Sequence, residues 1–148
     1  MKPKFGDVVY VHRTLGYDHY GVYVGRGKVI HYGVGEGGTS AGGGSNGVVT
    51  QTTLRKFLES DAPDDLEVAS YPKLDGRAAR QRCVDRARSS LGEKDYNLVF
   101  NNCEHFARWC RTGESLSTQV EKAATHVVSA VLAVGIEMLL EKHGVAIG

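Results

Sequence analysis

One cysteine stands where a thiol could be activated for nucleophilic chemistry. The segment Asn101-Asn102-Cys103-Glu104-His105-Phe106 opens a run whose spacing predicts a helix from Cys103 to Arg111, ended by Gly113. An Asn at the N-cap places Cys103 in the first turn, where unpaired backbone N–H groups point outward. Their partial positive charge favours a thiolate, and the same groups could bind a developing oxyanion. Cys103 is therefore the candidate nucleophile, against the alternative that it is a buried small hydrophobe like most cysteines.

The other two cysteines, Cys83 and Cys110, have positions typical of a core. Cys110 lies two helical turns beyond Cys103 on the same face, away from the helix terminus, and Cys83 lies mid-helix on an apolar row. Three cysteines cannot all pair within the chain, so we expect free thiols and an intracellular protein. No ligand pair has the spacing of a zinc site, and we expect neither a metal nor a cofactor.

A thiol nucleophile needs a base on rigid structure, and His19 and His31 are the candidates. They lie in two short strands that flank the Gly25-Arg26-Gly27 turn of a predicted hairpin. A three-residue turn pairs Val22 with Ile30 and makes the two imidazoles diagonal neighbours on one face of the hairpin. One imidazole could then orient the other, although a one-residue slip would separate them.

The elements that must position these residues can be read from the periodicity of the chain. Strands are predicted at 7–12, 19–24, 28–32, 48–50 and 66–71, and helices at 54–58, 75–91, 103–111 and 120–142. Strands come first and helices cluster later, which predicts an α+β fold with a small antiparallel sheet packed on the helix that begins near Cys103.

The composition is that of one ordinary globular domain. The chain has 148 residues, 41% hydrophobic and 24% charged, and a net charge of +1. So small a charge gives no field to attract nucleic acid. The N-terminus lacks an apolar signal region, and we expect a cytoplasmic location.

Glycine dominates the segment 33–47, which is predicted to be a long loop. Gly33, Gly35 and Gly38 happen to match the dinucleotide pattern G-x-G-x-x-G. That pattern requires a helix immediately afterwards to hold the pyrophosphate, whereas more glycine and serine follow here. Nucleotide binding is therefore excluded.

The last segment, 120–142, is predicted to be a helix that is apolar except for one row of polar residues. Its 18-residue stretch 123–140 contains His126 and Glu137, and a spanning helix needs about 20 apolar residues. We expect this helix to dock on the domain, to dimerise or to contact a membrane surface.

Taken together, three blocks of residues resemble the lecithin:retinol acyltransferase-like domain family. The blocks are 18–25, 29–32 and 102–107, which include His19, His31 and Cys103, and the resemblance covers about residues 4–120. The family includes the H-Ras-like suppressor phospholipase/acyltransferases and belongs to the permuted papain-like superfamily, in which the histidine precedes the cysteine. The combined blocks are far more specific than any one of them.

The resemblance implies roles for these residues. Cys103 corresponds to the family nucleophile, His19 to the general base and His31 to the polar residue that orients the base. It implies a phospholipase/acyltransferase domain over 1–119 that takes an acyl group from a glycerophospholipid as a Cys103 thioester and passes it to an amine, an alcohol or water. The segment 120–148 then forms a C-terminal helix, with peripheral membrane contact through 120–142. A cysteine peptidase and a non-catalytic binding module of the same fold are the alternatives.

Overall fold

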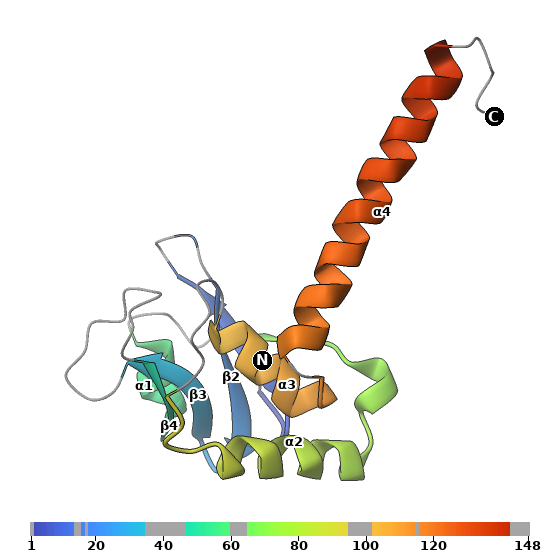
Figure 1. The fold of residues 1–148 in the computed structure, drawn as a ribbon. Helices are drawn as coiled ribbons and strands as arrows, with labels where there is room; N and C mark the ends of the chain where they lie inside the picture. Colours follow the sequence, from blue (N-terminus) through green and yellow to red (C-terminus); the bar gives the residue numbers. More distant parts are fainter. Residues whose placement is uncertain are drawn as a thin grey trace. The chain divides into compact units, whose positions relative to one another are not determined.

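The computed structural model describes residues 2–13, 16, 18–34, 47–59, 65–94, 102–114 and 116–142. The chain divides into two compact units, Met1–Glu114 and Ser115–Gly148 (Figure 1). In chain order the elements are β1 (Val8–His12), β2 (Asp18–Gly25), β3 (Lys28–Val34), β4 (Gly47–Thr53), α1 (Leu54–Leu58), β5 (Glu67–Val68), the 3-10 turn η2 (Pro72–Leu74), α2 (Arg77–Ser89), α3 (Asn102–Thr112) and α4 (Leu116–Lys142).

The first unit is built on an antiparallel sheet with the strand order β4-β3-β2-β1-β5. Together with the helices, this sheet confirms the α+β class. β5 is much shorter than the predicted strand 66–71, because only Glu67 and Val68 pair with β1. The chain leaves the sheet before Pro72, whose ring nitrogen has no hydrogen to donate to a strand ladder.

In the hairpin between β2 and β3, Val22 pairs with Ile30 as predicted, but the turn that sets this pairing differs from the predicted one. The turn has two residues, Arg26 and Gly27, both at positive φ, and Gly25 pairs with Lys28. The predicted three-residue turn is therefore wrong. A register shift between Tyr23 and Gly25 offsets the shorter turn, so that Val22 faces Ile30 as predicted.

Both faces of the sheet are buried. Val22, Val24 and Ile30 pack with residues of α2 and α3, among them Cys83 and Phe106. A second cluster on the opposite face contains Val9, Val11, Val29, Phe57, Leu58 and Leu66. Phe57 and Leu58 are the buried residues of α1. The sheet thus has α2 and α3 on one side and α1 on the other (Figure 1).

The helix ends follow their sequence signals. Thr53 caps α1, its side chain accepting a hydrogen bond from the Lys56 backbone N–H. Gly92 after α2 and Gly113 after α3 both have positive φ, as predicted for residues that end a helix. The predicted glycine-rich loop falls largely on 35–46, outside the described residues.

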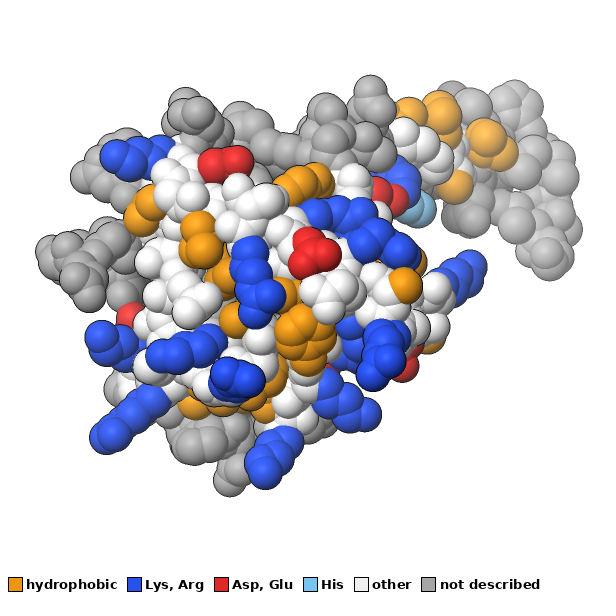
Figure 2. All heavy atoms as spheres, turned by 90° about the horizontal axis from the view of Figure 1, so that it is seen from below, with side chains coloured by type: hydrophobic (Ala, Val, Ile, Leu, Met, Phe, Trp, Pro, Cys, Tyr) orange, Lys and Arg blue, Asp and Glu red, His pale blue; other side chains and the backbone are white. Residues whose placement is uncertain are grey.

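Basic side chains gather on the face of the first unit that α2 and the β2–β3 turn present (Figure 2). The exposed basic residues of α2 and of the β2–β3 hairpin include Arg26, Lys28, Arg82 and Arg88. This turn lies at the end of β2 farthest from Asp18. A net charge of +1 for the whole chain cannot reveal such a local excess.

In the second unit, α4 carries a long apolar surface. Val127, Val128, Val131, Leu132, Val134 and Ile136 are each between 55% and 65% exposed. Among the residues described, no helix has both the length and the apolarity of a membrane span.

Candidate active site

Cys103 lies in the first turn of α3, as predicted, since the helix begins at Asn102. Its partly buried thiol packs against the cluster between the sheet and α3. The Sγ–H donates to the carbonyl oxygen of Asp18 at 3.6 Å. Main-chain groups of Tyr20 and Glu104 also hydrogen-bond the sulfur. The thiol therefore contacts the backbone of β2 at the two peptide groups that flank His19.

Burial, however, has a larger effect on the pKa of this thiol than the backbone groups at the start of α3. Loss of solvent raises the pKa of Cys103, whereas the backbone hydrogen bonds from Tyr20 and Glu104 lower it by less. The nearby Glu104 carboxylate raises it further. The expectation of a thiolate is therefore wrong for this state of the protein, in which Cys103 is a neutral thiol.

His19 and His31 lie together on one face of the hairpin, as the spacing predicted. His19 Nε2 and His31 Nδ1 are 3.0 Å apart, and the two rings meet edge to face. Phe57 of α1 stacks on the His19 ring at a centroid distance of 4.9 Å and touches His31 with its edge. A Cβ at Gly21 would collide with Val29 and press on Phe57, so glycine permits this close packing.

Both imidazoles are neutral at pH 7. Burial and then the neighbouring His31 lower the pKa of His19 from 6.5 to about 3. Burial and then Arg13 lower the pKa of His31 from 6.5 to about 4. One ring must donate and the other accept in the bond between them. Because this bond occupies Nε2 of His19, its Nδ1 is the nitrogen left for a further partner.

The thiol and the imidazole pair approach β2 from opposite faces. Cys103 packs with the cluster on the side of α3, and Phe57, which stacks on His19, belongs to the cluster on the side of α1. On β2, the sulfur hydrogen-bonds main-chain groups of Asp18 and Tyr20. The two groups are thus neighbours through the backbone of one short segment of β2.

Several residues near this segment were not predicted to take part. Arg13 donates hydrogen bonds to the carbonyl oxygens of Phe57 and Leu58, which fixes α1 beside the imidazoles. His12, which had no predicted partner, pairs through Nδ1 with Asp18. Only the β1–β2 register, which sets His12 opposite Asp18, could have suggested that second contact.

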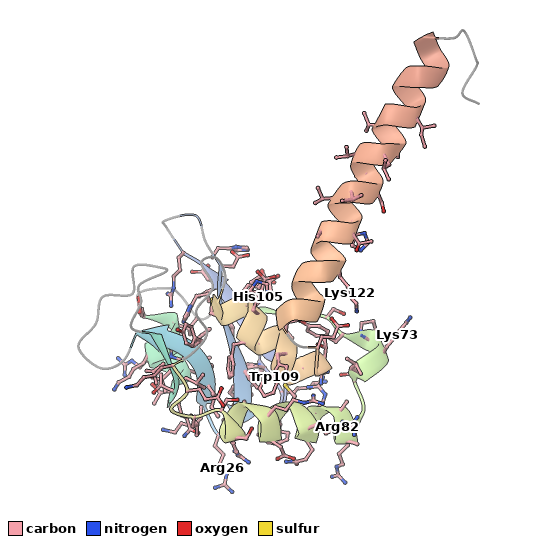
Figure 3. The ribbon with its side chains drawn as sticks, viewed as in Figure 1. Arg26, Lys73, Arg82, His105, Trp109 and Lys122 are labelled. Carbon is pink, nitrogen blue, oxygen red and sulfur yellow. The ribbon has the colours of Figure 1, made fainter. Side chains whose placement is uncertain are left out.

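The other cysteines are buried in the core, as predicted. Cys83 and Cys110 are both fully buried, and burial raises the pKa of each thiol. His105 lies at the start of α3 near Cys103 (Figure 3). Within the described part of the chain, no group of three or more His, Cys, Asp or Glu residues is arranged to hold a metal ion.

The fold and the site define a class: a small α+β domain with a cysteine in the first turn of a helix and two paired histidines on the preceding strands. Residues 1–116 match the sequence model of the family described as Lecithin retinol acyltransferase. The chain belongs to this family.

Relatives in the family are similar over most of this chain. Human phospholipase A and acyltransferase 4 is 30% identical over 135 residues, 86% of this chain and 80% of the relative. Human phospholipase A and acyltransferase 2 is 32% identical over 136 residues, 85% and 81% respectively. Mouse lecithin retinol acyltransferase is 32% identical over 134 residues, which cover 79% of this chain and 58% of the mouse protein.

Proposed function

We propose that this protein is a phospholipid acyltransferase and phospholipase A that works through a thioester on Cys103. His19 acts as the general base, and His31 orients it. The observation that carries the proposal is the position of the Cys103 thiol against the two peptide groups that flank His19. The names of the relatives support the same chemistry, since they describe phospholipases A and acyltransferases.

In the proposed reaction, the thiol gives its proton to Nδ1 of His19 as the sulfur attacks the carbonyl carbon of a glycerophospholipid ester. Main-chain N–H groups at the start of α3 stabilise the oxyanion. The carbon–oxygen ester bond then breaks, and the lysophospholipid oxygen takes the proton from the imidazolium. An amine, an alcohol or water next gives a proton to His19 and attacks the thioester, and the proton returns to the departing sulfur.

The resting charges constrain how the first step proceeds. A thiol with a raised pKa and an imidazole with a pKa of about 3 do not form a stable ion pair in the free protein. Proton transfer and attack on the ester must therefore be coupled in one step. In the free protein the His19 ring and the sulfur lie on opposite faces of β2, so the proposed transfer also requires that lipid binding rearrange β2 and bring the ring to the sulfur.

The proposal includes a location at a lipid surface. The apolar surface of α4 suits contact with a membrane, where burial yields about 25 cal/mol per Å² of apolar area. We propose that the protein is cytoplasmic and associates peripherally with membranes through 120–142.

A non-catalytic binding module is the second candidate, because the thiol donates to a carbonyl oxygen rather than to an imidazole. Cys103→Ser and Cys110→Ser test this alternative as a matched pair. Cys103→Ser should reduce release of fatty acid from phosphatidylcholine to below roughly one-thousandth of wild type, because a serine lacks the thiol nucleophile. Cys110→Ser should retain most turnover and mainly lower the melting temperature.

A fluorescent phosphatidylcholine in mixed micelles provides the turnover measurement, and circular dichroism shows that each variant is folded. Equal loss of turnover in the two variants would remove Cys103 as the nucleophile. Absence of turnover in wild type, in the presence of amine and alcohol acceptors, would favour the binding module.

A further inference from the structure

A polar pair with no part in the proposed chemistry lies on the outer side of α3. Arg108 Nη2 donates to Glu104 Oε1 at 3.0 Å, and the guanidinium also hydrogen-bonds the side chain of Tyr71. These contacts use two of the five N–H donors of an arginine. The Arg108 side chain is 44% exposed, so its other donors can reach a ligand.

This pair adjoins the nucleophile at the start of α3. Glu104 directly follows Cys103, and the Tyr20 ring packs on the same cluster as Cys103 and Tyr71. Burial, followed by the charge of Glu104, raises the pKa of Tyr20 to about 12, and Tyr71 contributes to the same shift. Glu104 and Tyr71 both act on the Tyr20 phenol, so these polar groups and Arg108 lie near one another beside the start of α3.

A second positive charge, that of Arg111, lies beside Tyr71. Arg111 is 3% exposed and lies over the Tyr71 ring, with its guanidinium carbon 5.6 Å from the ring centroid. Its Nη1 has no hydrogen-bond partner among the described residues. Its acidic neighbour Asp75 is 3.9 Å away and is also bound by Arg80. Positive charge behind Tyr71 is thus only partly compensated.

We propose that Arg108 and Tyr71 bind the phosphate of the acyl donor, which rests on the proposed function and names the part of the substrate that this surface recognises. An arginine fork and a phenol hydroxyl are suitable donors for a phosphate monoanion. In the free protein, Glu104 holds the Arg108 side chain in place until the phosphate takes over part of its hydrogen bonding.

The spacing fits a glycerophospholipid. Five covalent bonds separate the sn-2 carbonyl carbon from the phosphorus, a span of roughly 6 Å. Arg108 lies five residues beyond Cys103, a rise of about 7.5 Å and a rotation of about 140° around α3. Its guanidinium nevertheless reaches back to the carboxylate of Glu104, the residue that follows Cys103. With the ester carbonyl at the sulfur, the phosphate therefore lies within reach of the Arg108 side chain.

Two donors with identical acyl chains test the inference. They are dihexanoylphosphatidylcholine and dihexanoylglycerol, which lacks the phosphate. Arg108→Gln should lower kcat/KM for the phospholipid about 10-fold or more, the effect of losing a charge-assisted hydrogen bond, and leave the diacylglycerol nearly unchanged. Arg108→Lys should recover part of the loss, since it restores the charge without the fork. Arg82→Gln, which changes an exposed arginine of α2, is the matched control (Figure 3).

A binding measurement decides the question independently of turnover. Calorimetric titration of the Cys103→Ser protein with glycerophosphocholine should show saturable binding that the added Arg108→Gln change abolishes, and choline alone should not bind. Equal losses on both donors, or binding that survives Arg108→Gln, would overturn the phosphate site. If wild type turns over neither donor while binding still depends on Arg108, the proposed function fails and the phosphate site stands.

Discussion

At the scale of single residues, the charge of the site is decided by burial. A helix terminus alone lowers a thiol pKa, but here loss of solvent outweighs the backbone hydrogen bonds and Cys103 stays neutral. His19 and His31 are neutral for the same reason. Under the proposed mechanism, the neutral Cys103 thiol stays unreactive until substrate arrives, because the thiolate is the reactive form of a thiol.

The roles proposed for the two histidines differ, and their variants should differ accordingly. His19→Ala should reduce phospholipid turnover as severely as Cys103→Ser, because the thiol loses the group that accepts its proton. His31→Asn should cost only about 10-fold, since an amide can still hydrogen-bond the imidazole. Steady-state turnover of phosphatidylcholine gives both values. An inactive His31→Asn protein beside an active His19→Ala protein would exchange the two roles.

Sequence could predict that His19 and His31 share one face of the hairpin but not the charge of either ring. The alternation of side chains along a strand is enough to set His19 and His31 on one face. By contrast, Phe57 reaches His19 from an element far along the chain, and Arg13 contacts the carbonyl oxygens of α1. Desolvation depends on such long-range packing, so the lowered pKa values could not be inferred from local spacing.

At the scale of elements, the sheet was predicted better than its details. Strand positions follow from composition, and the pairing of Val22 with Ile30 was correct. The length of the turn was predicted wrongly. A two-residue turn with a register shift gives the same pairing beyond Tyr23 as a three-residue turn, so the pairing could not distinguish the two. The buried face beneath α1 was also missed, since a five-residue helix gives little periodic signal.

Burying two imidazoles between β2, β3 and α1 should make the domain sensitive to acid. In the unfolded chain both titrate at 6.5, whereas in the folded protein they titrate at about 3 and 4. As pH falls below 6.5 the unfolded state takes up protons that the folded state cannot, so the free energy of unfolding decreases. The slope approaches about 1.4 kcal/mol per pH unit for each imidazole.

Urea denaturation at several pH values between 6.5 and 5 measures this slope. The range is chosen because most carboxylates titrate below it. The His19→Asn/His31→Asn double variant is the control, and its free energy of unfolding should depend much less on pH. Parallel curves for the two proteins would contradict the burial of neutral imidazoles.

At the scale of the whole molecule, the chain combines a catalytic candidate with an apolar helix. The domain match ends at residue 116, where α4 begins. The exposed valines and leucine of α4 are too apolar to be left in water without a partner. We therefore expect α4 to govern access to lipid rather than the chemical step.

Removing residues 115–148 should lower the rate on phosphatidylcholine vesicles about 10-fold or more while sparing hydrolysis of a soluble short-chain ester. Val131→Lys/Leu132→Lys is a milder change that should act in the same direction, and Ser129→Lys, on the polar row, should act less. Vesicle co-sedimentation and circular dichroism accompany the kinetics. Loss of both activities together with the fold would assign α4 to the structural core instead.

The central claim is that Cys103 carries the acyl group, and intact-protein mass spectrometry tests it most directly. The protein is mixed with phosphatidylcholine of defined chains, quenched in acid within seconds and digested to locate any adduct. We predict a mass increase equal to one fatty acyl group on Cys103, removed by hydroxylamine and absent from the Cys103→Ser and His19→Ala proteins. An acyl group on any other residue, or lipid turnover that proceeds in the Cys103→Ser protein, would contradict it.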